Sequence, residues 1–505
     1  MEENKFSTLR DLWEYRVKRT PYKEFLIADE AHFTYSDIDK LAENKAMFMS
    51  SLGIKTGDIV SLQFELDISD ISFMIACMKI GAVINPVNPR FDISEIKNLV
   101  YKLRPRAIFA QQALRGRDTL FNVDQLFDYK SFYSTDLRYF IRQSESSFAQ
   151  EYTSQSPALI LNTSGTTGSS KGVVLTNRNI LSAEIMFNNA FNIVKSDMIG
   201  MPSGLYHAIG FHHGLISTIL AGSSMVIMRH YSAEILAQEI KQNKITYIDS
   251  VPTVIYDLLF RINDLGQIRQ LICSGDKLHQ NLLEQAKKRK IPLYNCYGLT
   301  EAVPFSYTPS DYFKAHNYMV TALKPMEGMT IKLLDANKKE ILEKNKCGTI
   351  WVKGPTIFEE YYLEPQKTRK VLKDRWFNTE DYGHYNDDGL LEVDGRSSDK
   401  IIRGGENISA SFVEEKIREC KNITDVAVVG VPDVRLGQKI GAFIITDDKN
   451  LDKDRLIKEL IQQKVEKKFW PEKLYVVKSI PKTATGKVRK YLLKQGIKNK
   501  IYYER

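Results

Sequence analysis

Residues 163–172 read Thr163-Ser164-Gly165-Thr166-Thr167-Gly168-Ser169-Ser170-Lys171-Gly172. This stretch gathers hydroxyls, glycines and one lysine directly after Ala158-Leu159-Ile160-Leu161, an apolar run that predicts a buried strand. Glycines allow neighbouring backbone N–H groups to point into one hollow, and the hydroxyls and the lysine add donors and positive charge. The stretch therefore predicts a loop that binds a polyphosphate. A flexible Ser/Gly surface loop is the alternative that its composition leaves open.

The order of residues in this loop differs from that of the P-loop NTPases. In the P-loop the lysine follows a glycine and precedes Ser or Thr, whereas Lys171 follows Ser170 and precedes Gly172. The P-loop NTPase class is therefore not favoured.

Apolar runs on both sides of the loop alternate with amphipathic stretches. Residues 59–64 and 224–228 predict strands, and Ser232 is placed to cap a following helix. Ile38, Leu41, Phe48 and Leu52 fall at helical spacing. Strands that alternate with helices indicate parallel sheets covered by helices, and the short strands and turns near residues 348–354 predict a small β-barrel.

A chain of 505 residues is too long for one core. The turn signal Asp387-Asp388-Gly389 lies just before a predicted boundary at residues 395–399. Residues 426–431 and 442–445 predict strands of a separate unit. We therefore predict an α/β fold with a large N-terminal domain, residues 1–395, and a small α+β C-terminal domain, residues 396–505. The large domain is expected to hold two parallel-sheet α/β subdomains and the small barrel.

Composition excludes several classes of protein. No apolar run reaches the roughly 18–20 residues of a membrane span, and the acidic start of the chain lacks an apolar h-region, so we predict neither an integral membrane segment nor a signal peptide. The five cysteines are scattered without a CxxC pair, which favours a reducing cytoplasm over a zinc site.

Much of the net charge of +9 lies near the C-terminus. No base-stacking aromatic pattern or DNA-binding motif accompanies it, so we predict no nucleic-acid partner. A phosphate-rich cofactor, an acidic carrier protein or simply a solvated basic face remains as its explanation.

The chain resembles the adenylate-forming, or AMP-binding, superfamily, in its acyl-CoA synthetase and fatty acid or aryl-CoA ligase branch. The similar motifs follow in family-like order from about residue 30 to about residue 495. Besides the loop, they are, in chain order, Phe33-Thr34-Tyr35-Ser36-Asp37, Met78-Lys79-Ile80-Gly81-Ala82-Val83 with Asn88-Pro89-Arg90, Tyr294-Asn295-Cys296-Tyr297-Gly298-Leu299-Thr300-Glu301, Trp376-Phe377-Asn378-Thr379-Glu380-Asp381, Gly395-Arg396 and Pro481-Lys482-Thr483-Ala484-Thr485-Gly486-Lys487.

The resemblance implies that a carboxylate attacks the α-phosphorus of ATP, releasing pyrophosphate, and that the acyl group then passes to CoA. It implies a set of phosphate-binding residues: Thr163, Ser164, Gly165, Thr166, Thr167, Gly168 and Lys171. Glu301 would help to hold Mg²⁺, which prefers oxygen ligands, and Lys487 would be the catalytic cation that bridges carboxylate and α-phosphate. The adenine and ribose contacts would be Gly275, Asp276, Lys277, Cys296, Tyr297, Gly298, Thr300, Asp381 and Arg396. Tyr297 would offer a flat face to adenine, and the Asp381 carboxylate would accept both ribose hydroxyls.

The resemblance also implies a CoA site and a hinge. Gly404, Gly405 and Glu406 follow Arg396 at the spacing seen in CoA ligases, and Arg90 is a further CoA candidate. The C-terminal domain would rotate at Ser398 and Asp399 between the two half-reactions.

Four departures leave the acceptor open between CoA and a carrier-protein phosphopantetheine. Glu380 and Glu360 replace glycines that are usual before the ribose aspartate and before Tyr361. Residues 274–277 resemble the Gly-Glu form of adenylation domains, and residues 403–406 resemble aryl-acid adenylases.

The motifs give the least information about the residues that line the acyl pocket. The resemblance places it at Phe187, His207, Ala208, Ile209 and Val303, with His207 near the substrate carboxylate. These mostly apolar residues predict an uncharged aliphatic or aromatic tail, and no aspartate is present in the His207 region to hold an α-amino group. His212 and His213 raise the question of a metal, but adjacent histidines point in different directions and no convergent carboxylate is evident, so none is predicted there.

Three functions remain to be separated. The leading one is an AMP-forming acyl-CoA synthetase that acts as a monomer or homodimer on a carboxylic acid, ATP and CoA with Mg²⁺. The second is a stand-alone adenylation enzyme that loads an acyl carrier protein, and the third is a nucleotide-binding regulatory protein on a retired enzyme fold.

Overall fold

The computed structural model describes residues 6–91, 93–111, 129–133, 137–142, 151–163, 171–396, 400–403, 406–482, 488–499 and 501–502. The chain divides into two compact units. Unit 1 comprises residues 1–164, 170–330 and 352–377, and unit 2 comprises residues 165–169, 331–351 and 378–505. Within the described residues the strands form four sheets.

A nine-stranded sheet lies in unit 1 and positions most of the predicted adenine and acyl residues. Its central strands run parallel from β1 to β14, and antiparallel strands close both edges. Its strands, in spatial order, are β16 (Lys324–Pro325), β15 (Ala302–Tyr307), β14 (Leu293–Leu299), β13 (Gln270–Cys273), β12 (Tyr247–Ser250), β10 (Met198–Met201), β11 (Ser224–Ile227), β1 (Glu24–Ala28) and β2 (Ala31–Thr34).

An eight-stranded sheet of unit 1 carries the strands on either side of the predicted phosphate loop. Strands β3, β4, β5 and β8 pair in parallel, whereas β9 pairs antiparallel with β8 and with β19. Its strands, in spatial order, are β19 (Glu360–Tyr361), β9 (Lys171–Thr176), β8 (Pro157–Thr163), β4 (Val83–Pro86), β3 (Ile59–Gln63), β5 (Ala107–Gln111), β7 (Leu137–Arg142) and β6 (Tyr129–Tyr133).

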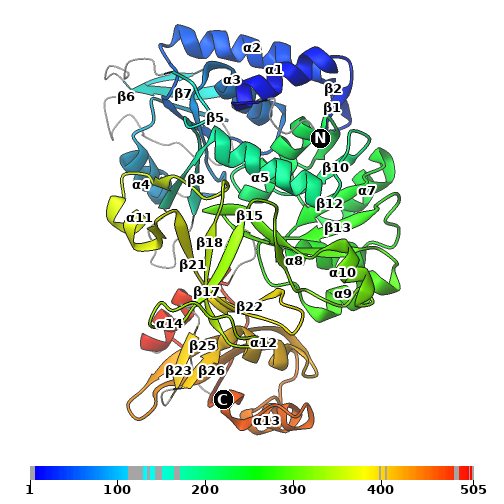
Figure 1. Ribbon diagram of the computed structural model, residues 1–505, viewed down its shortest axis with the longest axis vertical. Coiled ribbons are helices and arrows are strands. Elements are labelled where there is room, and N and C mark those ends of the chain that lie inside the picture. Colours follow the sequence, from blue (N-terminus) through cyan, green and yellow to red (C-terminus); the bar gives the residue numbers. More distant parts are fainter. Residues whose placement is uncertain are drawn as a thin grey trace. The chain divides into compact units, whose positions relative to one another are not determined.

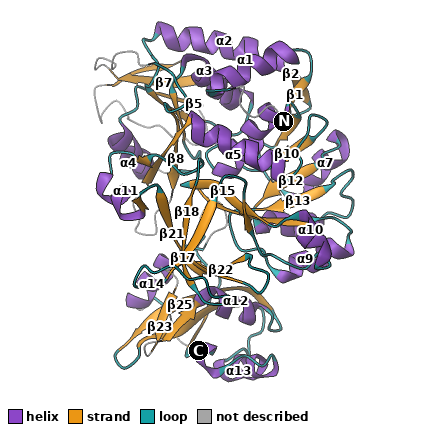
Figure 2. Ribbon diagram, in the orientation of Figure 1, coloured by secondary structure: helices purple, strands orange, loops and turns teal. Residues whose placement is uncertain are grey.

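The helices of unit 1 alternate with these strands (Figure 2). The first three, α1 to α3, pack against one another (Figure 1). The helical segments are α1 (Leu9–Arg19), α2 (Tyr35–Ser51), α3 (Ile68–Ile80), α4 (Ile93–Leu103), α5 (Asn177–Ala190), the π-helix η2 (Ile209–Ile216), α6 (Ser217–Ala221), α7 (Ala233–Asn243), α8 (Pro252–Tyr256), the π-helix η3 (Asp257–Arg261), α9 (Gln280–Lys288), α10 (Ser310–Ala315) and α11 (Pro365–Val371). The predicted cap is present, because the Ser232 hydroxyl accepts the Ile235 N–H at the start of α7.

A third sheet stands where the sequence predicts a small barrel. Its order is β17 (Thr330–Leu334), β18 (Gly348–Lys353), β21 (Trp376–Tyr385) and β20 (Leu372–Lys373), with β22 (Leu391–Arg396) on β21. The divisions between units 1 and 2 fall within β17, β18 and β21.

Unit 2 has a core of its own around a fourth sheet. Apolar residues of β25 and β26 pack with those of α12 and α13, among them Val413, Val428 and Leu456. The elements are β23 (Lys400–Arg403), β24 (Glu406–Ser409), α12 (Ala410–Arg418), β25 (Ile423–Asp433), β26 (Gly437–Thr446), α13 (Lys453–Gln462), the 3₁₀-helix η5 (Lys467–Phe469), β27 (Lys473–Val476) and α14 (Lys490–Lys498). No helix in the described part of the chain combines the length and hydropathy that crossing a membrane requires.

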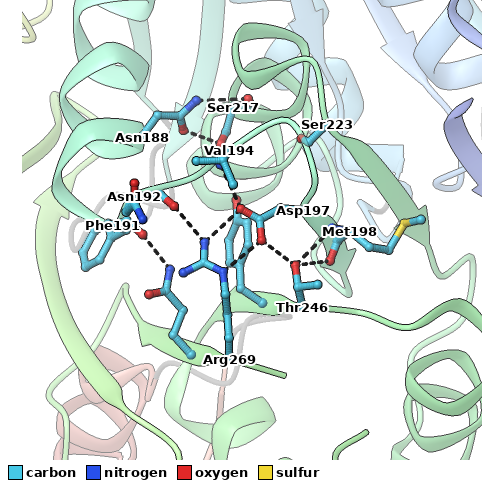
Figure 3. A network of polar contacts seen from close by, with 12 residues as sticks. Asn188, Phe191, Asn192, Val194, Asp197, Met198, Ser217, Ser223, Thr246 and Arg269 are labelled. Carbon is cyan, nitrogen blue, oxygen red and sulfur yellow. Dashed lines mark hydrogen bonds and ion pairs between the residues drawn. The ribbon is translucent and has the colours of Figure 1, made fainter. Parts of the chain in front are cut away.

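A buried polar network ties the connection before β10 to strands β12 and β13 (Figure 3). Arg269 donates from Nε and Nη2 to the two oxygens of Asp197, at 2.9 and 2.8 Å. The hydroxyl of Thr246 and the N–H of Val194 also donate to this carboxylate, at 2.7 and 2.8 Å. Burial would raise the pKa of Asp197, but the hydrogen bonds from Arg269, Val194 and Thr246 outweigh it and the pKa is lowered.

We expect Arg269→Met to lower the free energy of unfolding by about 1–3 kcal/mol, because it leaves a buried carboxylate without its cation. Since the folded pKa of Asp197 lies below the unfolded value, its contribution is present at neutral pH and is lost as the pH falls through the folded pKa. Chemical denaturation at neutral and acidic pH measures both effects. Arg261→Met is the matched control, because Arg261 pairs with Asp257 at the surface and exposed pairs contribute less than about 1 kcal/mol. Equal losses of unfolding free energy in the two variants would contradict a stabilising role for the Arg269–Asp197 pair.

Candidate active site

The predicted phosphate loop follows β8 and precedes β9, which pair with each other. Thr163 is the last residue of β8 and faces Lys171, the first residue of β9, in the antiparallel register. Both are half-buried, and the loop residues between them, Ser164, Gly165, Thr166, Thr167 and Gly168 included, lie outside the described part of the chain.

Tyr361 brings the predicted phosphate and magnesium residues together. It lies on β19, which pairs with β9 immediately after the loop, in the register Tyr361↔Val173. The Nζ of Lys171 stands 4.7 Å from the centre of the Tyr361 ring, and the Tyr361 hydroxyl donates to Oε1 of Glu301 at 2.7 Å. The Phe358 N–H also donates to the Glu301 carbonyl, at 2.9 Å. A cation from β9 and a carboxylate from the turn between β14 and β15 therefore both contact the side chain of Tyr361.

The predicted adenine residues follow the carboxyl ends of neighbouring parallel strands. Gly275, Asp276 and Lys277 come after β13 and are exposed, and Tyr297 lies in β14. Gly275 has a φ of 84°, and a Cβ there would stand 3.4 Å from Ile209 Cδ1 and Val251 Cγ1. This edge of a parallel sheet is where ligands of open α/β folds bind.

Tyr297 and its neighbours pack against buried residues of the sheet. The Tyr297 ring packs edge-on against buried Phe305, with centroids 4.6 Å apart, and Cys296 is buried. A Cβ on Gly298, in β14, would lie only 3.0 Å from the Ala302 carbonyl oxygen, so a side chain here would require the neighbouring backbone to shift. Thr300 precedes Glu301 in the turn between β14 and β15.

His207 lies between β10 and η2, beside the same edge. The side chain is half-buried with its Nε2 enclosed. Burial lowers the pKa of His207 to about 4, and the charge of the exposed Arg90 guanidinium acts in the same direction. The imidazole is therefore neutral at pH 7. Arg90, predicted as a CoA contact, is near enough to His207 to affect its charge.

Of the remaining predicted pocket residues, Ile209 begins η2 and Ala208 precedes it, whereas Phe187 lies on α5 and Val303 on β15. Phe187 and Val303 are buried, whereas Ala208 and Ile209 are half-buried. The Phe187 ring stacks on the His213 ring with centroids 3.9 Å apart and an interplanar angle of 14°.

Our expectation that no carboxylate converges on His212 and His213 is wrong. The Nδ1 atoms of His212 and His213 lie 3.2 and 3.3 Å from Oε1 and Oε2 of Glu184 on α5. The rings do diverge, with an interplanar angle of 54°, but one carboxylate has two oxygens and serves both. Even so, the described residues include no cluster of three or more His, Cys, Asp or Glu side chains fit to hold a metal.

Asp381 and Arg396 are opposite each other in unit 2. They are register partners of the β21–β22 hairpin, and the buried Asp381 donates its N–H to the Thr379 hydroxyl at 3.1 Å. Glu380, where the family motif has glycine, has a φ of 59°. That backbone region favours glycine, which gives a physical reason for the usual residue. Glu360 is not among the described residues with positive φ.

Several predicted residues cannot be placed. Lys487, Ser398, Asp399, Gly404 and Gly405 lie outside the described residues. Of Glu406 only the backbone is described, at the start of β24 and opposite Arg403.

Comparison with known families decides the identity of the chain. The profile described as "AMP-binding enzyme" matches residues 13–362, and the profile "AMP-binding enzyme C-terminal domain" matches residues 413–487. The chain belongs to the AMP-binding enzyme family. The resemblance stated from the motifs is thereby confirmed.

Members of the AMP-binding family with assigned activities align with almost the whole chain. It is 28% identical to a medium-chain fatty-acid–CoA ligase of Escherichia coli, covering 98% of this chain and 91% of the relative. It is 26% identical to an indoleacetate–CoA ligase of Aromatoleum aromaticum, covering 96% and 97%. These relatives agree with the predicted acyl- and aryl-CoA ligase branch.

Solved structures of AMP-binding enzymes confirm the predicted α/β fold with a C-terminal domain. The o-succinylbenzoate CoA synthetase MenE of Bacillus subtilis, solved with its acyl-adenylate intermediate, superimposes with a TM-score of 0.84 at 21% identity, covering 97% of this chain and 99% of that chain. ATP-bound MatB of Rhodopseudomonas palustris gives a TM-score of 0.82 at 22% identity, covering 97% and 99%.

Tyr361, Glu184 and Asp249, a buried β12 residue whose Oδ2 lies 4.0 Å from His213 Nε2, were not among the predicted site residues. Tyr361 stands in a recognised motif, so its position was a usable signal. Glu184 and Asp249 carry none, because a single acid in an amphipathic helix or at a strand end is common on a solvated face.

Proposed function

We propose that this chain is an AMP-forming acid–thiol ligase. It activates a fatty or aryl carboxylic acid with ATP to an acyl adenylate and then transfers the acyl group to CoA, giving acyl-CoA, AMP and pyrophosphate. The observation that carries the proposal is that Lys171, the first residue after the proposed phosphate loop, and Glu301 both contact Tyr361. The names of the relatives, CoA ligases for fatty and aryl acids, support the same reaction class.

The chemical difficulty of the first step is electrostatic, because a carboxylate must approach a polyanion. In this proposal Thr163, Lys171 and the loop between them hold the β- and γ-phosphates. Preorganised donors of this kind contribute about 10²–10³ each in rate by analogy with oxyanion holes.

The residues present fit a magnesium ion. Mg²⁺ is commonly held by one or two carboxylates together with substrate phosphates and water, so a single carboxylate such as Glu301, oriented by Tyr361, suffices. When bound, the ion would neutralise charge on the phosphates. The contribution of this chain is to fix the orientation of the carboxylate.

The proposed nucleoside contacts are those that the family resemblance implies. We assign adenine to Gly275, Asp276, Lys277, Cys296, Tyr297, Gly298 and Thr300, and ribose to Asp381 and Arg396. Gly404, Gly405, Glu406 and Arg90 are proposed for CoA, with Ser398 and Asp399 as the hinge at the start of a C-terminal domain that spans residues 396–505.

CoA is the proposed acceptor, and a carrier-protein phosphopantetheine is the alternative. The four buried thiols Cys77, Cys273, Cys296 and Cys420 are consistent with the proposed cytoplasmic location, where cysteines stay reduced. We also propose a role in fatty acid metabolism, and a monomer or homodimer.

The proposal is tested by acid-dependent ATP–pyrophosphate exchange over fatty, aryl and dicarboxylic acids, followed by thioester formation with CoA or a holo-carrier protein. We expect exchange with a fatty or aryl acid and thioester formation with CoA alone. Glu301→Gln should lower exchange by at least about tenfold, whereas the control Glu360→Gln, which removes an exposed carboxylate on the same strand as Tyr361, should leave it nearly unchanged. If none of the tested acids supports exchange, a regulatory nucleotide-binding protein is favoured. If the acyl group is transferred only to the carrier protein, the adenylation enzyme is favoured.

A further inference from the structure

The side chain of Tyr361 is held in one position within unit 1. Tyr361 is 2% exposed, and its ring packs on that of Phe358 with centroids 4.8 Å apart. Its N–H donates to the Thr368 hydroxyl at 3.0 Å, and the pairing with Val173 of β9 fixes the strand. Since close-packed side chains stay in their rotamer minima, the phenol is a rigid part of the site.

Two oppositely charged groups contact this phenol at different atoms. The Lys171 Nζ stands over the Tyr361 ring, 4.7 Å from its centre, and Glu301 Oε1 accepts a hydrogen bond from the Tyr361 hydroxyl at 2.7 Å. The face of an aromatic ring attracts a cation, and the hydroxyl is a donor suited to a carboxylate. Each charge therefore has a favourable contact with the same neutral side chain.

The two charges do not pair with each other. In the part of the chain that the structure describes, neither the Lys171 ammonium nor the Glu301 carboxylate has an ion-pair partner. Both groups nevertheless contact one ring, and a lysine has a long and flexible stem. An ammonium and a carboxylate so close together attract each other strongly when little water lies between them.

A pair between Lys171 and Glu301 would impede the proposed first step. The phosphates of ATP require the ammonium, and Mg²⁺ requires the carboxylate. If these two groups were paired in the empty site, the pair would have to be broken before either ligand could bind, and this cost would weaken binding. Groups that are already positioned and unpaired avoid it.

We propose that Tyr361 is a positioning residue that keeps the phosphate-binding cation and the metal-binding carboxylate apart until ATP and Mg²⁺ bind. The inference rests on the proposed function and adds a role for the ring to the orientation of Glu301 by the hydroxyl. The ring holds the ammonium of Lys171 on its face and blocks its approach to Glu301. The ring therefore acts on phosphate binding, and the hydroxyl acts on metal binding.

The role of the ring is tested by the binding of magnesium-free ATP to the full-length protein, measured by calorimetry in the presence of EDTA. Tyr361→Leu should raise the Kd about tenfold, because the phosphates must then displace Glu301 from Lys171. In a Glu301→Gln background, where no carboxylate can pair with Lys171, Tyr361→Leu should change the Kd by less than about threefold. An equal loss of affinity in both backgrounds overturns the inference, because a structural role of the ring would not depend on the charge of Glu301.

The role of the hydroxyl is tested by Tyr361→Phe, which keeps the ring. The Kd for magnesium-free ATP should stay within about twofold of the wild-type value, since the ring still separates the two charges. The Mg²⁺ concentration that gives half-maximal pyrophosphate exchange should rise about tenfold or more, because Glu301 loses the donor that orients it. A loss of ATP affinity as large as that of Tyr361→Leu, or an unchanged requirement for Mg²⁺, overturns the division of roles between ring and hydroxyl.

The neighbouring ring provides the matched control. Tyr362 packs against a separate apolar cluster that includes Leu103 and Val174, so Tyr362→Leu should leave both quantities nearly unchanged. Calorimetry gives the Kd separately from the binding-competent fraction, and Tyr361→Met, which keeps more of the buried volume, should behave like Tyr361→Leu. Unchanged ATP affinity in both of these Tyr361 variants overturns the inference while the proposed function stands. Failure of the wild-type protein to bind ATP overturns both.

Discussion

Lys487→Ala should lower ATP–pyrophosphate exchange by about 10³-fold or more, yet leave thioester formation from a supplied acyl adenylate largely intact. The reason is electrostatic: the family resemblance implies that Lys487 bridges the carboxylate and the α-phosphate oxygens, whose negative charges must come together only in the first half-reaction. Once the adenylate exists, the thiol attacks a carbonyl and the bridging cation has no comparable task.

The stretch that ends in Lys487 offers a matched control. Lys482 forms an antiparallel bridge with Val488, and its Nζ pairs with Asp425 at 2.6 Å. The neighbouring Arg489 N–H donates to the Pro481 carbonyl at 2.8 Å. Lys482 therefore has a structural partner, and Lys482→Ala should change exchange only a few-fold. Each half-reaction is measured separately, with a chemically prepared acyl adenylate for the second. Equal loss of both half-reactions in Lys487→Ala would count against a separate use of this lysine, and so would an equal loss in Lys482→Ala.

The sequence predicted the fold well where periodicity and composition agree. The run at residues 158–161 lies in β8, the run at 59–64 overlaps β3, and the cap at Ser232 is present. The helix predicted from Ile38, Leu41, Phe48 and Leu52 is α2, but its buried face differs. Leu41 is 36% exposed, whereas Ala42 and Ala46 are buried. Small residues face inward because α2 packs closely against α3. A prediction from the large apolar residues alone therefore misplaced the buried face of this helix.

The site was predictable only in part, and the reason is visible at particular residues. Thr163, Lys171, Glu301 and Asp381 could be predicted because their motifs are ordered along the chain. Glu184 and Asp249 were not, because what makes them notable is a meeting of α5, η2 and β12 that no local pattern encodes.

Asp381→Ala should raise the KM for ATP by roughly 30- to 1,000-fold, or abolish activity, while the fold persists. A carboxylate that accepts two ribose hydroxyls in a buried place contributes about 2–4 kcal/mol when both bonds are lost. Asp381 is 3% exposed, its N–H is fixed by Thr379, and the Thr379 hydroxyl donates in turn to the Ile350 carbonyl at 2.9 Å. The side chain therefore starts from a rigid backbone, so that little ordering remains to be done when the ribose binds.

The neighbouring residue separates a ribose contact from a general effect of charge. Glu380→Gln removes an exposed carboxylate one residue away and should leave the KM for ATP within about twofold, since exposed charges interact weakly through water. Asp381→Asn keeps the shape but loses the negative charge and one acceptor, so its KM should fall between those of the wild type and Asp381→Ala. Steady-state kinetics with ATP as the varied substrate measure all three, and thermal unfolding checks the fold. Unchanged ATP kinetics in Asp381→Ala would contradict the assignment of the ribose to this hairpin, because the loss of two charge-assisted hydrogen bonds must weaken ATP binding.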